Sequence, residues 1–140
     1  MLDVDHFKRI NDSQGHAAGD QALRTVSSAV MAPTRRSDIF GRVGGEEFAI
    51  ALPDTSIAGA QAFAEGLRGS LGTAMGGVSL TVSLGVTDAA TADRTVRGML
   101  HSADLALYAA KRAGRNRVVR ADALQLSDLA ATVIAPLAGA

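Results

Sequence analysis

The stretch D-I-F-G-R-V-G-G-E-E-F-A-I-A-L, residues 38–52, is the part of this sequence that decides its fold. Two apolar runs, at 38–43 and 46–52, flank a Gly-Gly pair at positions 44 and 45. A glycine pair between two such runs is typical of a tight turn that joins antiparallel strands. The stretch therefore predicts a β-hairpin, and Pro53 ends its second strand.

Helices and strands are predicted on both sides of this hairpin by the spacing of apolar residues. Gly and Pro residues mark several of their ends. The resulting order belongs to the α+β class, with helices packed over an antiparallel or mixed sheet. The expected elements are a strand end at 2–5, a short helical turn at 7–12, helices at 20–31, 57–71 and 95–113, and strands at 78–86 and 117–120.

Length and composition describe one globular domain. The chain has 140 residues, of which 47% are hydrophobic, and it carries 14 basic and 14 acidic residues. This balance excludes the basic surface that binds nucleic acid polymers without regard to sequence. The absence of cysteine excludes disulfides, thiolate nucleophiles and zinc sites built on sulfur. No run approaches the roughly 18 apolar residues of a membrane span, and no basic signal-peptide region opens the chain.

Acidic residues stand at two strand ends that the fold could bring together. Glu46 and Glu47 follow the Gly-Gly pair directly, and successive residues of a strand point to opposite faces, so one of them can face a site. Asp3 and Asp5 share one face at the end of the first strand. Oxygen ligands without histidine or cysteine suit Mg²⁺ bound together with substrate phosphates. The pattern thus points to metal-assisted phosphoryl or nucleotidyl transfer.

Spacing alone leaves simpler interpretations open for each of these groups. Acids at strand ends are commonly solvated boundary residues, and a motif match carries a real false-positive risk. Lys111 and Arg115 lie four residues apart at a helix C-terminus, where cations offset the helix dipole in any case. The basic segment from Arg35 to Asp38 reads equally well as a loop with solvated arginines, and the three histidines share no metal-binding spacing.

Taken together, these segments resemble the GGDEF family, the diguanylate cyclases. The resemblance extends over residues 2–120 and includes four motifs in the family's order. They are D-V-D-H-F-K-R-I-N-D-S-Q-G-H-A-A-G-D at 3–20, G-G-E-E-F at 44–48, T-V-S-L-G-V at 81–86 and A-D-L-A-L-Y-A-A-K-R-A-G-R-N at 103–116.

The resemblance implies a nucleotidyl-cyclase or palm-like fold with a ferredoxin-like core, whose mixed and mainly antiparallel sheet is covered by helices. It implies a transferase of bacterial signalling that condenses two GTP molecules into cyclic di-GMP and two pyrophosphates, with Mg²⁺ or Mn²⁺. Because each active site of the family holds one GTP, a second copy of the domain is an expected partner. The expected compartment is the cytoplasm, and membrane attachment of a longer parent chain is left open.

The family resemblance also assigns roles to residues at the predicted metal site. Asp3 and Glu46 would bind the metal as carboxylates, beside the backbone carbonyl of Val4. Glu47 would support metal binding or activate the 3′-hydroxyl, which makes Glu46 and Glu47 the expected catalytic residues. The expected GTP contacts are Phe7 and Lys8 along the triphosphate, Asn11 and Asp20 at the guanine edge, and Lys111 and Arg115 against the phosphate charge.

Arg35 and Asp38 match the R-x-x-D inhibitory site, which in this family binds the product cyclic di-GMP. A second arginine that often completes this site falls on Gly66 by ungapped count, and Arg68 lies two residues further on. The resemblance therefore predicts an allosteric cyclic di-GMP site whose inhibition is weakened.

Residues 1–121 are expected to form the GGDEF domain, without the helix and the D-x-L-T-G-L-x-N-R segment that normally precede the first strand. The chain then resembles a fragment of a longer signalling protein, and its apolar tail at 122–140 receives no predicted chemistry. The truncation keeps a second function open: a non-catalytic module that binds GTP or cyclic di-GMP.

Overall fold

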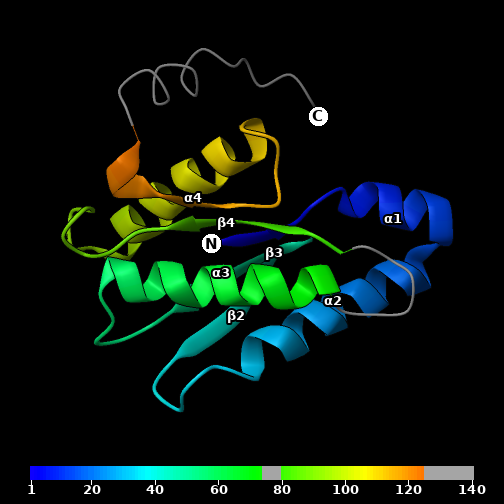
Figure 1. Ribbon diagram of the computed structural model, residues 1–140, viewed down its shortest axis with the longest axis horizontal. Coiled ribbons are helices and arrows are strands. Elements are labelled where there is room, and N and C mark those ends of the chain that lie inside the picture. Colours follow the sequence, from blue (N-terminus) through cyan, green and yellow to red (C-terminus); the bar gives the residue numbers. More distant parts are fainter. Residues whose placement is uncertain (74–79, 125–140) are drawn as a thin grey trace.

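A five-stranded sheet runs through the centre of the structure, a computed structural model that describes residues 1–73 and 80–124 (Figure 1). The strands lie in the order β2-β3-β1-β4-β5, and all neighbours are antiparallel except the parallel pair β4 and β5. This mixed, mainly antiparallel sheet confirms the predicted α+β fold class. The strands are β1 (Leu2–Val4), β2 (Ile39–Gly44), β3 (Glu47–Ala51), β4 (Val82–Val86) and β5 (Val118–Arg120).

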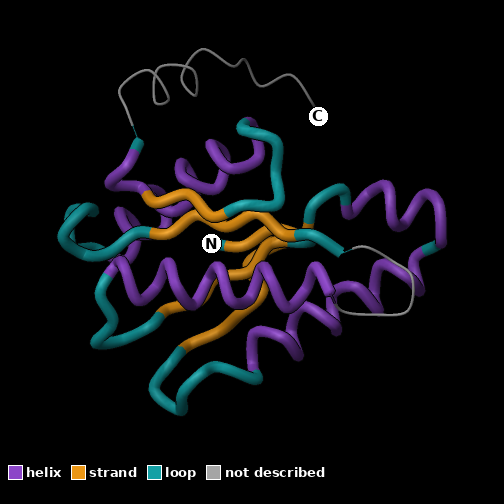
Figure 2. The backbone as a smooth tube through the Cα atoms, in the orientation of Figure 1, coloured by secondary structure: helices purple, strands orange, loops and turns teal. Residues whose placement is uncertain are grey.

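Helices cover both faces of this sheet. Helices α2 and α3 pack on one face and α4 packs on the other, while α1 continues away from the end of β1 (Figures 1 and 2). Among the described residues, no helix has the length and apolar character needed to cross a membrane. The helices are α1 (Phe7–Gln14), α2 (His16–Met31), α3 (Ile57–Thr73), α4 (Val96–Arg112) and the short 3-10 helix η1 (Ala121–Ala123).

The face under α2 and α3 is a conventional apolar core. Alternate residues of the central strands point into it and meet the apolar sides of the two helices. Burying one such large side chain stabilises the fold by about 1.5–3 kcal/mol. The core contains Leu2, Val4, Phe48, Val82, Leu84 and Val86 from the strands, Leu23, Val26 and Val30 from α2, and Ala64, Leu67 and Leu71 from α3.

The face under α4 is built from small and polar residues. A Cβ atom on Gly85 would lie only 2.0 Å from the Ala103 carbonyl oxygen and 2.3 Å from the Leu107 nitrogen. The backbone of α4 therefore rests directly on β4 at this glycine. The alanines at positions 103, 106 and 110 of α4 are buried, which allows the same close approach. This packing explains why the residues of α4 that face β4 are alanines.

The first two helices begin and end differently from the prediction. Helix α1 continues to Gln14, and α2 begins at His16, four residues before the predicted start at position 20. Between them Gly15 adopts φ 85°, a left-handed conformation that glycine tolerates. A single glycine therefore separates the two helices, and the residues after it continue directly into α2.

The hairpin is also formed as predicted, but its turn is shifted by one residue. Strand β2 includes Gly44 and β3 begins at Glu47, so Gly45 and Glu46 form the turn. An irregularity in pairing between Arg42 and Gly44 accounts for the shift. Strand β4 begins at Val82 rather than at 78, and residues 78 and 79 lie outside the described residues, as do 125–140 of the predicted tail.

Candidate active site

The end of β1, the hairpin turn and the start of β4 meet at one edge of the sheet. Asp3 is paired in register with Glu47 on one side and with Ser83 on the other. The backbone amide of Val4 donates a hydrogen bond of 3.2 Å to the carbonyl oxygen of Glu46. Residues far apart in sequence thus place three acidic side chains at this edge, as the strand pattern predicted.

Asp3 is the buried member of the three acids. It is 5% exposed, and the Nζ atom of Lys111 lies 2.8 Å from its Oδ2 atom. Burial raises the pKa of the Asp3 carboxyl above its usual value, the Lys111 ammonium opposes this, and the charges of Glu46 and Glu47 raise it further. The two glutamates are therefore close enough to repel the Asp3 carboxylate.

This donor set fits Mg²⁺. Its side-chain ligands are carboxylate oxygens, and a divalent cation would relieve their mutual repulsion. Within residues 1–73 and 80–124, no three acidic or histidine side chains stand close enough together to enclose a metal ion by themselves. A Mg²⁺ ion at this edge would have to complete its shell with substrate phosphates and water, as it commonly does when it binds through one or two carboxylates.

The Gly44-Gly45 pair leaves bare backbone beside these carboxylates. Neither glycine has a positive φ angle, so the chain conformation does not require glycine at either position. A Cβ on Gly45 would contact nothing within 4 Å, and one on Gly44 would meet only the Glu47 carboxylate, at 3.4 Å. The absence of both side chains therefore has no packing reason, and it keeps the surface open to a ligand.

The N-terminus of helix α1 presents backbone amides that have no partner within the helix. Its first residues are Phe7 and Lys8, and the N-cap residue His6 makes no side-chain capping hydrogen bond. A helix N-terminus in this state favours anions. The helix begins at Phe7, three residues after β1 ends at Val4, so its N-terminus lies near the end of that strand.

The predicted guanine-binding residues come together at the junction of α1 and α2. A Cβ on Gly19 would lie 1.9 Å from the Asn11 Oδ1 atom and 3.2 Å from the Phe7 ring. Gly19 therefore provides the space that the Asn11 side chain occupies, and Asp20 follows it directly on α2 with an exposed carboxylate. The Asn11 amide and the Asp20 carboxylate are thus both placed at the α1–α2 junction.

Lys111 and Arg115 lie at the C-terminal end of α4, but they have different surroundings. Lys111 contacts Asp3, so in this structure it neutralises a carboxylate instead of facing solvent as a phosphate ligand. Arg115 is exposed and has φ 63° in the turn between α4 and β5. The two cations share one end of the helix with the carboxylates.

Arg35 and Asp38 form a closed turn before β2. The Asp38 carboxylate accepts a hydrogen bond of 2.7 Å from the Arg35 amide, and the Asp38 amide donates one of 3.0 Å to the Arg35 carbonyl. The Arg35 side chain is exposed. Arg68 contacts other residues than Arg35 and Asp38. Its guanidinium donates hydrogen bonds to the Glu65 carboxylate, at 2.9 Å, and to the Asn116 Oδ1 atom, at 3.1 Å.

Sequence reasoning grouped Asp5 with Asp3 but missed its surroundings. Asp5 is 4% exposed and accepts hydrogen bonds from Thr81 and Ser83, two hydroxyl residues of the segment predicted as a strand, and from the Asn116 amide. The alternation of hydroxyl and apolar residues in T-V-S was the signal that could have revealed these partners.

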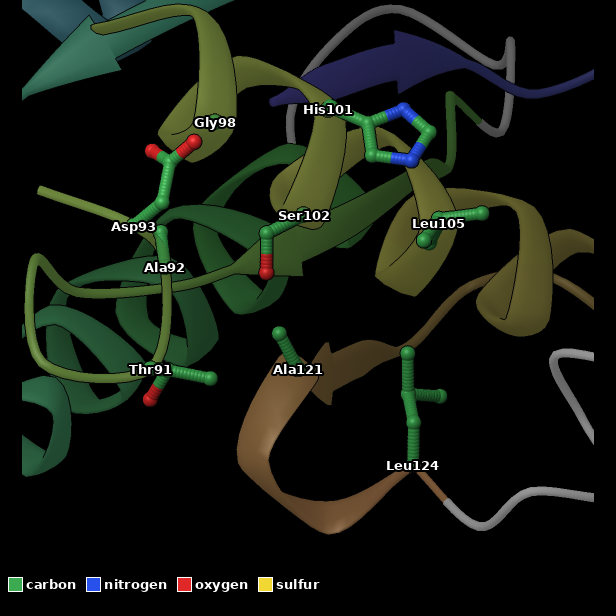
Figure 3. A pocket seen from close by; sticks show the side chains of 9 residues that line it. All are labelled: Thr91, Ala92, Asp93, Gly98, His101, Ser102, Leu105, Ala121 and Leu124. Atoms are coloured by element: carbon green, nitrogen blue, oxygen red, sulfur yellow. The ribbon is translucent and has the colours of Figure 1, made fainter. Parts of the chain in front are cut away.

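A separate hollow of about 360 Å³ lies at the opposite end of β4 (Figure 3). It is formed by the loop after β4, one side of α4 and the start of the segment after β5, and it does not contain the carboxylates described above. Its lining residues are Thr91, Ala92, Asp93, Gly98, His101, Ser102, Leu105, Ala121 and Leu124.

Residues 1–117 match the family described as "Diguanylate cyclase, GGDEF domain". The chain is 40% identical over 123 residues to diguanylate cyclase DgcP of Pseudomonas aeruginosa, covering 84% of this chain and 18% of that protein. It is 40% identical over 126 residues to the response regulator PleD of Caulobacter vibrioides, covering 85% of this chain and 28% of that protein. The chain thus spans well under half the length of these relatives.

Solved structures give the same result. The GGDEF domain of YfiN (TpbB) from Pseudomonas aeruginosa is similar with a TM-score of 0.85 and 33% identity, over 94% of this chain and 78% of that one. The GGDEF domain of DgcB from Caulobacter crescentus, solved in complex with c-di-GMP, has a TM-score of 0.81 and 34% identity, over 87% of this chain and 75% of that one. Sequence and fold agree, and this chain belongs to the GGDEF family of diguanylate cyclase domains.

Proposed function

We propose that this domain condenses two GTP molecules into cyclic di-GMP and releases two pyrophosphates. The observation that carries the proposal is the convergence of Asp3, Glu46 and Glu47 beside the bare Gly44-Gly45 backbone, with Lys111 against Asp3. Carboxylates for a metal, cations for phosphate and an open backbone are the groups that nucleotidyl transfer needs.

The residues at this edge would bind the nucleotide in one orientation. The amides of Phe7 and Lys8 would hold phosphate oxygens at the start of α1, and Asn11 and Asp20 would pair with the guanine edge. Arg115 would neutralise phosphate charge, together with Lys111 once it leaves Asp3. These contacts contribute by positioning the reacting atoms, and positioning can lower the reaction barrier by about 7–11 kcal/mol.

Asp3, Glu46 and Glu47, with the Val4 carbonyl, would hold Mg²⁺ or Mn²⁺, which supplies Lewis-acid stabilisation of phosphate charge when bound. In the reaction, each 3′-oxygen forms a bond to the α-phosphorus of the other GTP as that phosphorus loses its bond to pyrophosphate. The hydroxyl proton passes to a nearby base, a role for which Glu47 is the candidate. Because one domain presents one such site, we propose a homodimer of facing domains.

We also propose that cyclic di-GMP binds at Arg35 and Asp38 and inhibits the reaction. The closed turn before β2 holds the Asp38 carboxylate on the Arg35 backbone amide, and the Arg35 side chain is exposed. Such an arrangement offers a donor for phosphate and an acceptor for a guanine edge. Arg68 is engaged with Glu65 and Asn116, so weak product inhibition remains our expectation.

We also propose the cytoplasm as the compartment of this reaction, because GTP is supplied there.

The ion pair between Lys111 and Asp3 favours one second candidate, a module that binds GTP or cyclic di-GMP without turnover. In such a module Lys111 would keep the Asp3 carboxylate neutralised. This candidate predicts saturable binding of both nucleotides and no metal-dependent release of pyrophosphate.

A concentration series of the purified 140-residue chain with GTP and Mg²⁺ separates the two candidates. Cyclic di-GMP is followed by mass spectrometry, and the Glu46→Ala variant serves as the control. If two domains must meet, product should rise with the square of the protein concentration and should disappear in the variant, which keeps its cooperative melt. A folded wild-type chain that binds GTP but releases no pyrophosphate would establish the binding module instead.

A further inference from the structure

We propose that Asp5 is a positioning residue that fixes the turn between α4 and β5 at the active site, and that it is not a metal ligand. The inference deepens the proposed function, because this turn carries Arg115 and follows Lys111 in the chain. Asp5 lies just beyond β1, two residues after Asp3, so the two carboxylates are on the same side of the sheet as α4. Their partners nevertheless differ completely.

The Asp5 carboxylate is saturated by neutral donors. Its Oδ1 atom accepts a hydrogen bond of 2.7 Å from the Ser83 hydroxyl. Its Oδ2 atom accepts one of 2.9 Å from the Thr81 hydroxyl and one of 3.0 Å from the backbone amide of Asn116. Both oxygens of this 4% exposed side chain are therefore in use, and none of the three donors is a cation. A buried carboxylate with this many donors is fully satisfied without a metal ion.

The turn that Asp5 holds has an unusual backbone. Gly114, Arg115 and Asn116 have φ angles of 114°, 63° and 45°, so three successive residues lie in the left-handed region. A non-glycine residue in that region costs about 1–3 kcal/mol and persists only where its surroundings hold it. The bond from the Asn116 amide to Asp5 is one such restraint, and the bond from Arg68 to the Asn116 side chain is another.

Loss of the Asp5 restraint would move groups that contact the nucleotide. Lys111 lies in the last turn of α4, and the Arg115 amide donates to the Ala110 carbonyl at 3.0 Å, so both cations are tied to the conformation of this turn. Displacing a positioned group by about 1 Å can lower the rate on the order of 100-fold. Asp5 would thus act on the reaction through Lys111 and Arg115, without contacting substrate itself.

The test compares Asp5→Asn, Asp5→Ala and Asp3→Asn. An asparagine at position 5 can present its carbonyl oxygen to Thr81 and Asn116 and its amide group to the Ser83 oxygen, so it keeps the hydrogen bonds and removes the charge. We expect Asp5→Asn to keep most of the turnover and of the affinity for GTP. Asp5→Ala should raise the KM for GTP and lower kcat, together by about 10- to 100-fold. Asp3→Asn should abolish turnover.

Two results would overturn the proposal. One is a folded Asp5→Asn variant as inactive as Asp3→Asn, because a metal ligand needs the charge and a positioning residue does not. The other is an Asp5→Ala variant with wild-type kcat and KM. If Asp5→Ala does not fold, Thr81→Val replaces it, since this variant removes one donor to Oδ2 and is expected to show a smaller change in the same direction.

Hydrogen exchange of the Asn116 amide gives a readout that does not depend on catalysis. The amide should be protected in the wild-type chain and in Asp5→Asn, and it should exchange faster in Asp5→Ala or Thr81→Val. A wild-type chain that makes no cyclic di-GMP would refute the proposed function, whereas unchanged exchange of Asn116 in the variants would refute the role of Asp5.

Discussion

The two faces of the central sheet carry different kinds of side chains. The face under α2 and α3 is lined by large apolar side chains such as Phe48 and Leu84, which are nearly inaccessible to solvent. The face under α4 carries Asp3, Ser83 and Gly85 on the same strands. Apolar burial stabilises the first face, and close backbone contact and hydrogen bonds hold the second.

This difference separates stability from chemistry within single strands. Strand β1 sends Leu2 and Val4 into the apolar core and Asp3 to the opposite side, toward Lys111. The apolar residues anchor the strand, so the carboxylate between them is held in place although its own burial is unfavourable. Substitutions on the two faces should therefore have different effects, and they are considered below in order of their expected change in the free energy of unfolding.

Phe48→Ala on the apolar face is expected to have the largest effect. Phe48 is 2% exposed and stacks on Phe40 with ring centroids 5.5 Å apart. Removing a buried phenylalanine side chain lowers the free energy of unfolding by about 3–5 kcal/mol. Urea unfolding followed by circular dichroism measures this loss, and Phe48→Leu should lose much less. A loss below about 1 kcal/mol for Phe48→Ala would mean that this face is not the main source of stability.

Gly85→Ala should affect the α4 face by overpacking. The added methyl group would meet the backbone of α4 at Ala103 and Leu107, so the helix must move away from β4. Overpacking of this kind costs about 1–3 kcal/mol. Because α4 carries Lys111, turnover should fall as well. Thermal melts and cyclic di-GMP formation report the two effects.

Gly66→Ala is the matched control for this change. Gly66 lies inside α3, and a Cβ there would contact nothing within 4 Å. Replacing an interior helix glycine by alanine should raise stability by up to about 1 kcal/mol. If both variants shift the melting temperature equally, close packing of α4 on β4 does not explain Gly85.

Most helices and strands of this fold could be predicted from sequence periodicity, but which helix covers which face of the sheet could not. The two apolar runs in 38–52 and the Gly-Gly pair between them predicted the hairpin, and the apolar spacing predicted four helical segments. The early start of α2 at His16 was missed, since residues 16–19 (H-A-A-G) carry no large apolar side chain to mark a helix face. Which helix covers which face depends on contacts between distant segments, such as Gly85 against Ala103, and no local pattern records them.

Asp3→Asn should have a small effect on stability and abolish turnover. Burial raises the pKa of Asp3 in the folded state, so ionisation of this group opposes folding, and the opposition grows as pH rises through the folded-state pKa. Removing the charge should leave the melting temperature at pH 7 unchanged or raised. Any gain should shrink as pH falls through the usual carboxyl value of 3.8, because below that value the wild-type group is protonated in both states.

Melts of wild type and Asp3→Asn from below pH 3.8 up to pH 7 test this sign, and mass spectrometry of cyclic di-GMP tests the loss of turnover. A melting temperature several degrees lower in the variant would show that the ion pair with Lys111 outweighs the unfavourable burial of Asp3.

The sequence motifs predicted which residues belong to the candidate site, but not which partners those residues contact. The alternation indicated that one of Glu46 and Glu47 can face a site, and the register of β1 with β3 pairs Glu47 with Asp3. The pairing of Lys111 with Asp3, and the hydrogen bonds that Asp5 accepts, depend on how α4 and its following turn pack on the sheet. Side chains that look equivalent in sequence, such as Asp3 and Asp5, therefore acquire different partners only in three dimensions.

Gly45→Ala should have the smallest effect on stability and still impair the site. Gly45 has neither a positive φ angle nor a neighbour within 4 Å of a Cβ position, so the change in unfolding free energy should stay within about 0.5 kcal/mol. A methyl group beside Glu46 and Glu47 would, however, occupy space that we assign to the nucleotide, and the KM for GTP should rise.

Gly41→Ala is the matched control, because Gly41 lies in β2 of the same hairpin and a Cβ there also meets nothing within 4 Å. Steady-state kinetics of the two variants distinguish a general effect on the hairpin from a local one at its turn. An equal rise in KM in both variants would mean that the glycines act through the structure of the whole hairpin and not through contact with the ligand at its turn. A rise confined to Gly45→Ala would mean that the turn lacks side chains because the ligand lies against it. Neither the backbone conformation nor the packing requires glycine at this position, so contact with the ligand would then be the reason for it.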